Sequence, residues 1–251
     1  MKNITSFPPG PQLLTGLGLA LTVLALGRPA AHAADGTWTN QTSGGLWNTA
    51  ANWSGGAVAE GAGATASFNL LDLAADHLVH LDGSHTLTAL TFGDLLTGTA
   101  GSWLLDDNAS SGANTLTLAG AAPTITVNAL GTGKGVTNGV VLAGSAGLTK
   151  AGAGTLALTN LSTFTGGLRL SGGTLVEDFT SLAAPTDLLN SANALTLGGG
   201  SLSLKGNATA NASQTLGNLT MTAGTASKIL LDPNAGTATT LALGSLATIS
   251  R

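Results

Sequence analysis

Residues Leu148–Val176, LTKAGAGTLALTNLSTFTGGLRLSGGTLV, show the pattern of this chain in its clearest copy. Its first alternating run is Thr155–Thr159, where Leu156 and Leu158 share one face because successive side chains of a strand point to opposite sides. The second run, Leu168–Leu170, repeats this arrangement. Glycines, which adopt positive φ easily, stand before, between and after the two runs. The stretch therefore predicts a unit of strand, turn, strand and turn.

One such unit cannot bury its own leucines, since two short strands expose an apolar face and an edge to water. Coiling successive units into parallel ladders gathers the apolar side chains into one interior, as in a β-solenoid. Looser copies of the alternation recur from about residue 85 onward, at Thr115–Leu118, Thr124–Val127, Val140–Leu142, Ala194–Leu197, Ser201–Leu204, Leu219–Met221, Ile229–Leu231 and Leu241–Leu243. We therefore expect an all-β solenoid.

The central stretch also contains an ordered motif of a lysine, a glycine-rich turn, T-L-x-L, aromatic-T-G-G and G-T-L. Its residues are Thr149-Lys150, Gly152–Leu156, Leu158, Phe164–Gly167 and Gly172–Leu175. This order closely resembles the autotransporter-associated β-strand repeat. Phe164 stands where that family usually has tyrosine, and we expect its ring to stay half-buried. The resemblance implies a right-handed parallel β-helix in a secreted or surface-displayed bacterial protein.

The composition excludes several classes of function. Only 8% of the 251 residues are charged, against about a quarter in a typical soluble protein. The basic residues beyond the leader are too scattered for a phosphate-binding patch, which argues against a nucleic-acid partner: Lys134, Lys150, Arg169, Lys205, Lys228 and Arg251. No cysteine is present, so disulfides, thiolate nucleophiles and cysteine metal sites are excluded. Aromatic residues make up 4% and tyrosine is absent, which argues against an aromatic-lined sugar groove.

The N-terminus is typical of an export signal. Lys2 precedes an apolar run, Leu13–Leu26, which is shorter than the roughly 20 residues that a membrane-spanning helix needs. A helix-breaking Gly27–Pro29 and the small-x-small site Ala31–Ala33 follow. We expect residues 1–33 to be a signal peptide cleaved after Ala33, with no membrane span afterwards. The alternative is a helix retained as a membrane anchor.

The segment 34–85 contains Trp38, Trp47 and Trp53, spaced by glycine and asparagine. A solenoid must close the end of its core with an atypical unit, and large flat rings suit that purpose. We interpret the segment as a Trp-rich N-terminal cap, and residues 86–251 as the β-helical repeat region. The alternative is a carbohydrate-binding strip.

Three of the four histidines lie near one another, at His77, His80 and His85, beside Asp76 and Asp82. Side chains three apart on a strand point to opposite faces, so the first two cannot chelate one ion. A zinc site needs three or four convergent ligands. We assign no metal, cofactor or catalytic residue.

A carbohydrate-active β-helix, a polysaccharide lyase or hydrolase, is the alternative function. Its carboxylates would come from Asp106-Asp107, Glu177-Asp178 or Asp72 with Asp76. Neighbouring carboxylates on a strand point to opposite faces, so we interpret Asp106-Asp107 and Glu177-Asp178 as solvated turns. Three carboxylates converging near one basic residue would revive the enzyme.

Two other folds are weighed against the solenoid. A β-sandwich also has many short strands, whereas a membrane barrel needs longer strands and more aromatic residues. Thr180–Asn190 is expected to be a loop leaving the β-helix, with a helical turn or two at most because of Pro185. Leu246–Arg251 has no polar capping unit, which favours truncation or an end that meets a partner.

The function predicted from sequence is a non-enzymatic, exported surface or extracellular β-helical protein, serving as a stalk, adhesive or matrix component. It would be outer-membrane-associated or extracellular. Expected partners are a surface polysaccharide, a protein, or further repeats of a longer chain.

Overall fold

The computed structural model describes residues 33–98, 101–109 and 112–246. The predicted signal peptide lies outside these ranges, apart from Ala33. In the described part, 21 strands are joined by loops and two short 3-10 helices, η1 (Ala50–Asn52) and η2 (Ser54–Gly56). None of the helices there is long and apolar enough to cross a membrane.

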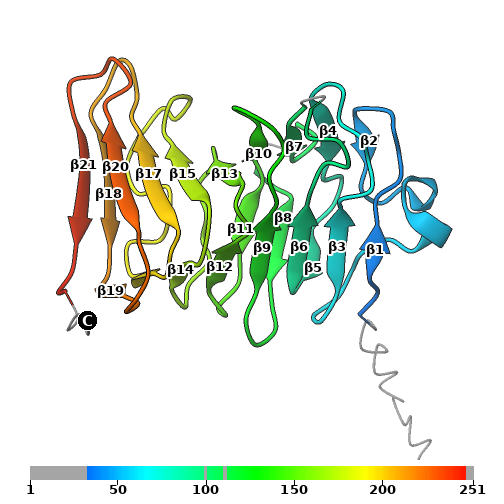
Figure 1. The fold of residues 1–251 in the computed structure, drawn as a ribbon, viewed down its shortest axis with the longest axis horizontal. Helices are drawn as coiled ribbons and strands as arrows, with labels where there is room; N and C mark the ends of the chain where they lie inside the picture. Colours follow the sequence, from blue (N-terminus) through cyan, green and yellow to red (C-terminus); the bar gives the residue numbers. More distant parts are fainter. Residues whose placement is uncertain (1–32, 99–100, 110–111, 247–251) are drawn as a thin grey trace, which may run out of the picture. The chain divides into compact units, whose positions relative to one another are not determined.

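Most strands belong to two long parallel sheets, each of eight strands (Figure 1). Sheet 1 consists of β1 (Gly36–Thr37), β3 (Thr65–Phe68), β6 (Ala89–Phe92), β9 (Thr124–Val127), β12 (Leu148–Ala151), β14 (Leu168–Leu170), β16 (Leu195–Leu197) and β19 (Leu219–Met221). Sheet 2 consists of β2 (Gly45–Leu46), β4 (His77–His80), β7 (Trp103–Asp106), β10 (Gly135–Asn138), β13 (Thr155–Leu158), β15 (Thr174–Asp178), β17 (Ser201–Lys205) and β20 (Lys228–Asp232).

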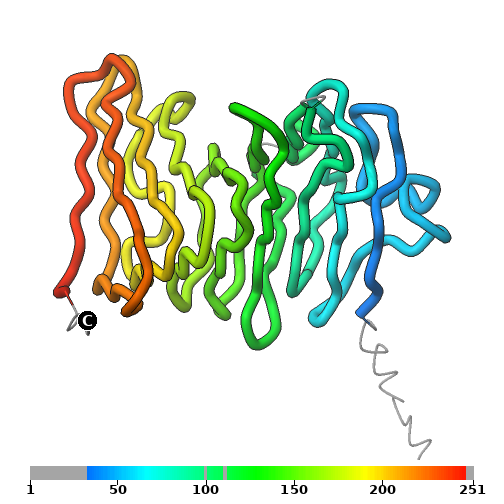
Figure 2. The backbone as a smooth tube through the Cα atoms, in the orientation of Figure 1, coloured from blue at the N-terminus to red at the C-terminus, as the bar shows by residue number. Residues whose placement is uncertain are grey.

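The third side of the coil carries two shorter parallel sheets. Sheet 3 consists of β5 (His85–Leu87), β8 (Thr115–Leu118) and β11 (Val141–Ala143), and sheet 4 of β18 (Ala212–Leu216) and β21 (Thr239–Leu243). The chain visits sheet 1, sheet 2 and the third side in turn, and then returns to sheet 1 one strand further along (Figure 2). This is a parallel β-helix. The β-sandwich alternative is wrong, because every pair of named strands is parallel.

The central stretch forms β12 to β15 as the alternation predicts. Leu156 and Leu158 point inward and are at most 1% exposed. Leu156 pairs with Leu175 of the next coil, which pairs with Leu202 of the coil after it. The leucines therefore stack in rows, and each coil covers the apolar face of its neighbour. Burying one such side chain contributes about 1.5–3 kcal/mol.

The Trp-rich segment closes the N-terminal end of the interior. Trp38, Trp47 and Trp53 are 0–2% exposed, and their ring centroids lie within 5.4–5.8 Å of that of Phe68. The cap hypothesis is confirmed, and the carbohydrate strip is wrong because the rings are buried. Parallel pairing begins already at β1, so the coils include the segment 34–85.

Two other expectations are corrected by burial. Thr180–Asn190 does not leave the β-helix: Leu188 and Leu189 are fully buried, and Thr186 bridges Ser213 in parallel. Two apolar side chains in this loop fill the third side of a coil that has no strand there. Phe164 is fully buried rather than half-buried, so the ring of the motif is a core residue.

Candidate interaction surface

The outward residues of sheet 1 form a row of hydroxyl groups interrupted by one cation. Thr124, Thr149, Arg169, Thr196 and Thr220 are partners in register on five successive strands. Parallel strands lie about 4.8 Å apart, so an extended ligand lying along this row meets one polar side chain per strand. We call these five residues the sheet 1 row.

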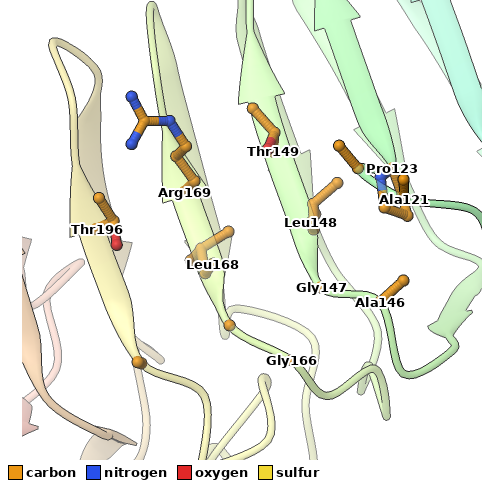
Figure 3. Close-up of a pocket in the computed structure, with 13 residues that line it drawn as sticks. Ala121, Pro123, Ala146, Gly147, Leu148, Thr149, Gly166, Leu168, Arg169 and Thr196 are labelled. Carbon is orange, nitrogen blue, oxygen red and sulfur yellow. The ribbon is translucent and has the colours of Figure 1, made fainter.

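A shallow groove of about 280 Å³ accompanies the row where the strands begin (Figure 3). Its floor is the backbone of the turns before β12 and β14, and its upper edge includes Thr149, Arg169 and Thr196, which project outward from the sheet. Pro123 and Ala121 close the side towards β9. No Asp or Glu lines the groove.

Sheet 1 carries few charged residues. On the strands of sheet 1 the charged residues are Lys150, which is buried, and Arg169, which is exposed. Lys134 and Lys205 elsewhere are paired with Asp76 and Asp178 at 3.1 Å. Among the described residues Arg169 has no ion pair, and its Nε donates to the Ser171 hydroxyl at 3.1 Å. The outer face of sheet 1 is therefore neutral apart from one cation.

The three neighbouring histidines point to separate places. His77 faces the interior, with its ring centroid 5.0 Å from that of Trp103, and burial lowers its pKa. His80 lies on the outer face and contacts Asp106 at 2.6 Å. His85 is buried and contacts Glu60 at 2.5 Å. The predicted opposite orientation of the first two is confirmed, and no group of three or more possible ligands occurs in the described ranges.

Of the candidate carboxylates, Asp72 and Asp76 line one small pocket of about 220 Å³ together with His77, and no third acid of the described residues joins them there. Asp106 contacts a histidine, Asp178 a lysine, and Asp76 another lysine. Burial raises the pKa of Asp178, but hydrogen bonds from Thr180 and Lys205 lower it by more. Its pKa is therefore below the usual value. These contacts are dispersed along the β-helix, and no acidic cluster able to bind a polysaccharide at a catalytic centre is present in the described part.

Glu177 is not in a solvated turn as predicted from sequence. It lies within β15, points inward after Leu175, and is fully buried between Leu158 and Leu204 of the adjoining coils. The error arose because the strand continues two residues beyond the apolar run. Neither carboxyl oxygen has a hydrogen-bond partner, and burial, with the charge of Asp187, raises its pKa to about 8. A substrate cannot reach this carboxyl.

Lys150 is a second buried ionisable group, which the sequence interpretation grouped with the scattered basic residues. The alternation places Leu148 and Lys150 on the inward face of β12, and that spacing was the available signal. Its Nζ donates to the carbonyls of Ala151, Gly152 and Gly172 at 2.7–3.2 Å. Burial lowers its pKa to about 8. The motif lysine therefore joins two glycine turns from inside.

Comparison with known proteins places these features in a family context. Residues 148–176 match the Passenger-associated-transport-repeat family. The chain is also 36% identical, over 184 residues, to a protein named "Adhesin BmaC autotransporter" from Brucella suis biovar 1 (strain 1330). That match covers 70% of this chain and 5% of the relative, so the chain spans about a twentieth of the relative's length. No solved structure matches the chain.

Proposed function

We propose that this chain, a passenger-type protein with the autotransporter-associated repeat, is an exported, non-enzymatic β-helical segment that adheres through its outer surface. The observation that carries the proposal is the sheet 1 row. It is a long hydroxyl-bearing face held rigid by stacked coils, with no convergent acids or histidines beside it.

Rigidity is the property that an adhesive surface needs from this fold. The strands of the row from β9 to β16 are each hydrogen-bonded to a neighbouring strand on both sides, and their inward apolar side chains belong to the continuous core. Side chains on such strands lose little freedom on binding, so less of the contact energy is spent on ordering them. The similarity to a protein named as an adhesin supports the same role.

Export to the bacterial surface is part of the proposal. It is supported by the resemblance of the repeat and by the predicted signal peptide. Surface polysaccharides, proteins or further repeats of a longer chain are the proposed partners.

The test is display of the full chain on a non-adherent bacterium, fused ahead of a translocating domain. Added protease should remove the chain from intact cells, which checks export. Displaying cells should be retained on a layer of host cells or extracellular polysaccharide at least tenfold above cells displaying no passenger. A triple variant, Thr124→Val, Thr149→Val and Thr196→Val, removes hydroxyls at nearly constant shape and should reduce retention.

A matched control changes hydroxyls on another face. Thr155→Val and Thr174→Val alter the outer side of sheet 2, where the two residues pair in register. These variants should leave retention unchanged. Display without retention above background would overturn the adhesive function, and release of sugar fragments from the polysaccharide by the purified chain would overturn its non-enzymatic character.

A further inference from the structure

We infer that the guanidinium of Arg169, beside the groove of Figure 3, binds an anionic group, a carboxylate or sulfate, of an acidic polysaccharide. This inference rests on the adhesive function proposed above and names the ligand class. It starts from the fact that an exposed guanidinium without a counter-charge stands on an otherwise neutral face.

The guanidinium has hydrogen-bonding capacity to spare. Arginine carries five N–H donors in a planar fork that matches carboxylate and similar oxyanions. In this structure Nε donates to the Ser171 hydroxyl, which fixes the side chain, and the terminal nitrogens donate to none of the described residues. The ends of the fork are thus left for a ligand.

The space beside the fork is bordered by hydroxyls and kept open by a glycine. A Cβ added at Gly198 would stand 3.1 Å from Nη2 of Arg169 and 3.4 Å from Oγ1 of Thr222. Thr196 lies in register with Arg169 on the neighbouring strand. An oxyanion placed there meets a guanidinium and hydroxyl donors. This space follows the ends of β14 and β16, whereas the groove crosses their starts, so Arg169 stands between the two.

The shape of the surface favours a polymer over a small ion. The groove is open and shallow and runs across the starts of β9, β12, β14 and β16, beside the row of threonines. Threonine hydroxyls spaced by the strand separation, about 4.8 Å, can donate to and accept from sugar hydroxyls along an extended chain. The arginine then selects a chain that carries negative charge.

The experiment measures binding of the purified full chain to immobilised polygalacturonate, dextran sulfate and neutral dextran. We expect binding to one or both acidic polymers, weakening with salt, and little binding to dextran. Arg169→Gln should weaken binding to the acidic polymer by about tenfold, the effect of losing one charge-assisted hydrogen bond. The polymer that binds identifies the anion as carboxylate or sulfate.

Two further variants separate a site from general charge. Lys228→Gln removes an exposed cation on sheet 2 that does not line the groove. It should leave binding within about twofold of the unchanged chain, because the contact depends on the planar fork of the arginine and not on net charge. Gly198→Ala keeps every charge but fills the space beside the fork, and should weaken binding several-fold. Circular dichroism should show the same fold for all three variants, because the altered positions lie on the outer surface or in a turn.

Three outcomes would overturn the inference: no binding to either acidic polymer, unchanged binding by Arg169→Gln, or equal losses for Arg169→Gln and Lys228→Gln. The cell-retention assay keeps this result separate from the proposed function. Retention that persists in Arg169→Gln leaves adhesion standing and removes the groove as its contact. Loss of all retention in the unchanged chain rejects adhesion, while polymer binding still tests the groove.

Discussion

The interior of the β-helix differs in kind between its first and its later coils. In the first coils Phe68 is the centre of an aromatic cluster, with five ring centroids 5.0–5.8 Å away. From β12 onward the interior is mainly leucine rows with two phenylalanines, and three long polar side chains are fully buried among them, Lys150, Glu177 and Gln214. At the first end the buried polar side chains are the rings of His77 and His85, which pack on tryptophans, whereas the later coils bury flexible polar chains among leucines.

The inserted polar groups show what such a core demands. Gln214 donates to the carbonyls of Leu189 and Thr215 and accepts from the amide of Leu189, and Lys150 has three carbonyl partners. Glu177 has none. A buried carboxyl without partners is costly when charged, so it remains protonated in the folded state. The later coils therefore contain both a satisfied and an unsatisfied ionisable group.

The largest effect should come from emptying the aromatic centre. Phe68→Ala removes a fully buried ring and leaves a cavity among five neighbours, which costs about 3–5 kcal/mol. All four tryptophans lie in the first coils, so tryptophan fluorescence follows that end while far-UV circular dichroism follows the whole chain. In urea the fluorescence transition should move to lower concentration than the circular dichroism transition.

A control for this change is Leu95→Ala, since Leu95 is 59% exposed and its loss should alter stability by less than about 0.5 kcal/mol. Coincident shifts of both signals in Phe68→Ala would mean that the two kinds of interior unfold as one unit. A loss below about 1 kcal/mol would contradict the central role of the ring.

The next effect should be a gain at Glu177. Glu177→Leu continues the row from Leu158 to Leu204. The pKa of Glu177 is about 8 in the folded state and 4.5 in the unfolded state. Between pH 4.5 and 8 the folded chain therefore holds a proton at this carboxyl that the unfolded chain has released. Stability of the unchanged chain therefore falls as pH rises from about 4.5 to 8, by about 1.4 kcal/mol per unit. At pH 7 the variant should be more stable by about 3 kcal/mol.

The measurement is the urea midpoint at several pH values, compared between the unchanged chain, Glu177→Leu and Glu177→Gln. Both variants should abolish the same part of the pH slope, since both remove the titrating group. A difference between variant and unchanged chain that is constant from pH 5 to 8 would show that Glu177 is charged in the folded protein.

The repeat's alternation allowed the fold to be predicted, while the polar interior was only partly visible in the sequence. Thr155–Leu158 and Leu168–Leu170 became strands at the predicted bounds or within one residue of them, because alternation and flanking glycine agree there. Strand β10, GVTN, was missed since Val136 is its one apolar inward residue. The coil that packs on it, and not its own pattern, makes it a strand.

The surface is harder to predict than the core because it depends on register between distant segments. Thr149, Arg169 and Thr196 are 20 and 27 residues apart along the chain, and the coil lengths that align them vary. Glu177 was interpreted as part of a solvated turn, because neighbouring carboxylates on a strand point to opposite faces and acidic residues are common in turns. Only the pairing of its strand on both sides shows that its side chain faces inward.

A smaller loss is expected at Lys150. Lys150→Met keeps an unbranched side chain but leaves three carbonyl groups without their donor, at a net cost of about 2 kcal/mol at pH 7. The pKa of Lys150 is about 8 in the folded state and 10.5 in the unfolded state. Between pH 8 and 10.5 the unfolded chain therefore binds a proton at this amine that the folded chain does not. Stability conferred by this residue should therefore rise from pH 8 to 10.5, opposite in direction to the change at Glu177.

Urea unfolding of Lys150→Met and of the unchanged chain from pH 7 to 10.5 checks both the loss and its direction. Lys228→Met, at an exposed position, is the matched control and should show neither. If Lys150→Met is as stable as the unchanged chain, the carbonyls are satisfied in another way, and the lysine does not join the two turns.

The smallest effect should come from Leu231→Thr in the last described coil, where the row of inward leucines reaches solvent. Leu231 pairs with Leu204, yet it is 43% exposed while Leu204 is fully buried. The same change therefore has two different costs in one row. Leu204→Thr should cost several kcal/mol by placing a hydroxyl in the core, whereas Leu231→Thr should cost less than about 1 kcal/mol, because half of its side chain already contacts water. The urea midpoints of the two variants give the two losses of stability. Equal losses would mean that Leu231 is covered in solution, and that the last coil is as closed as the tryptophan end.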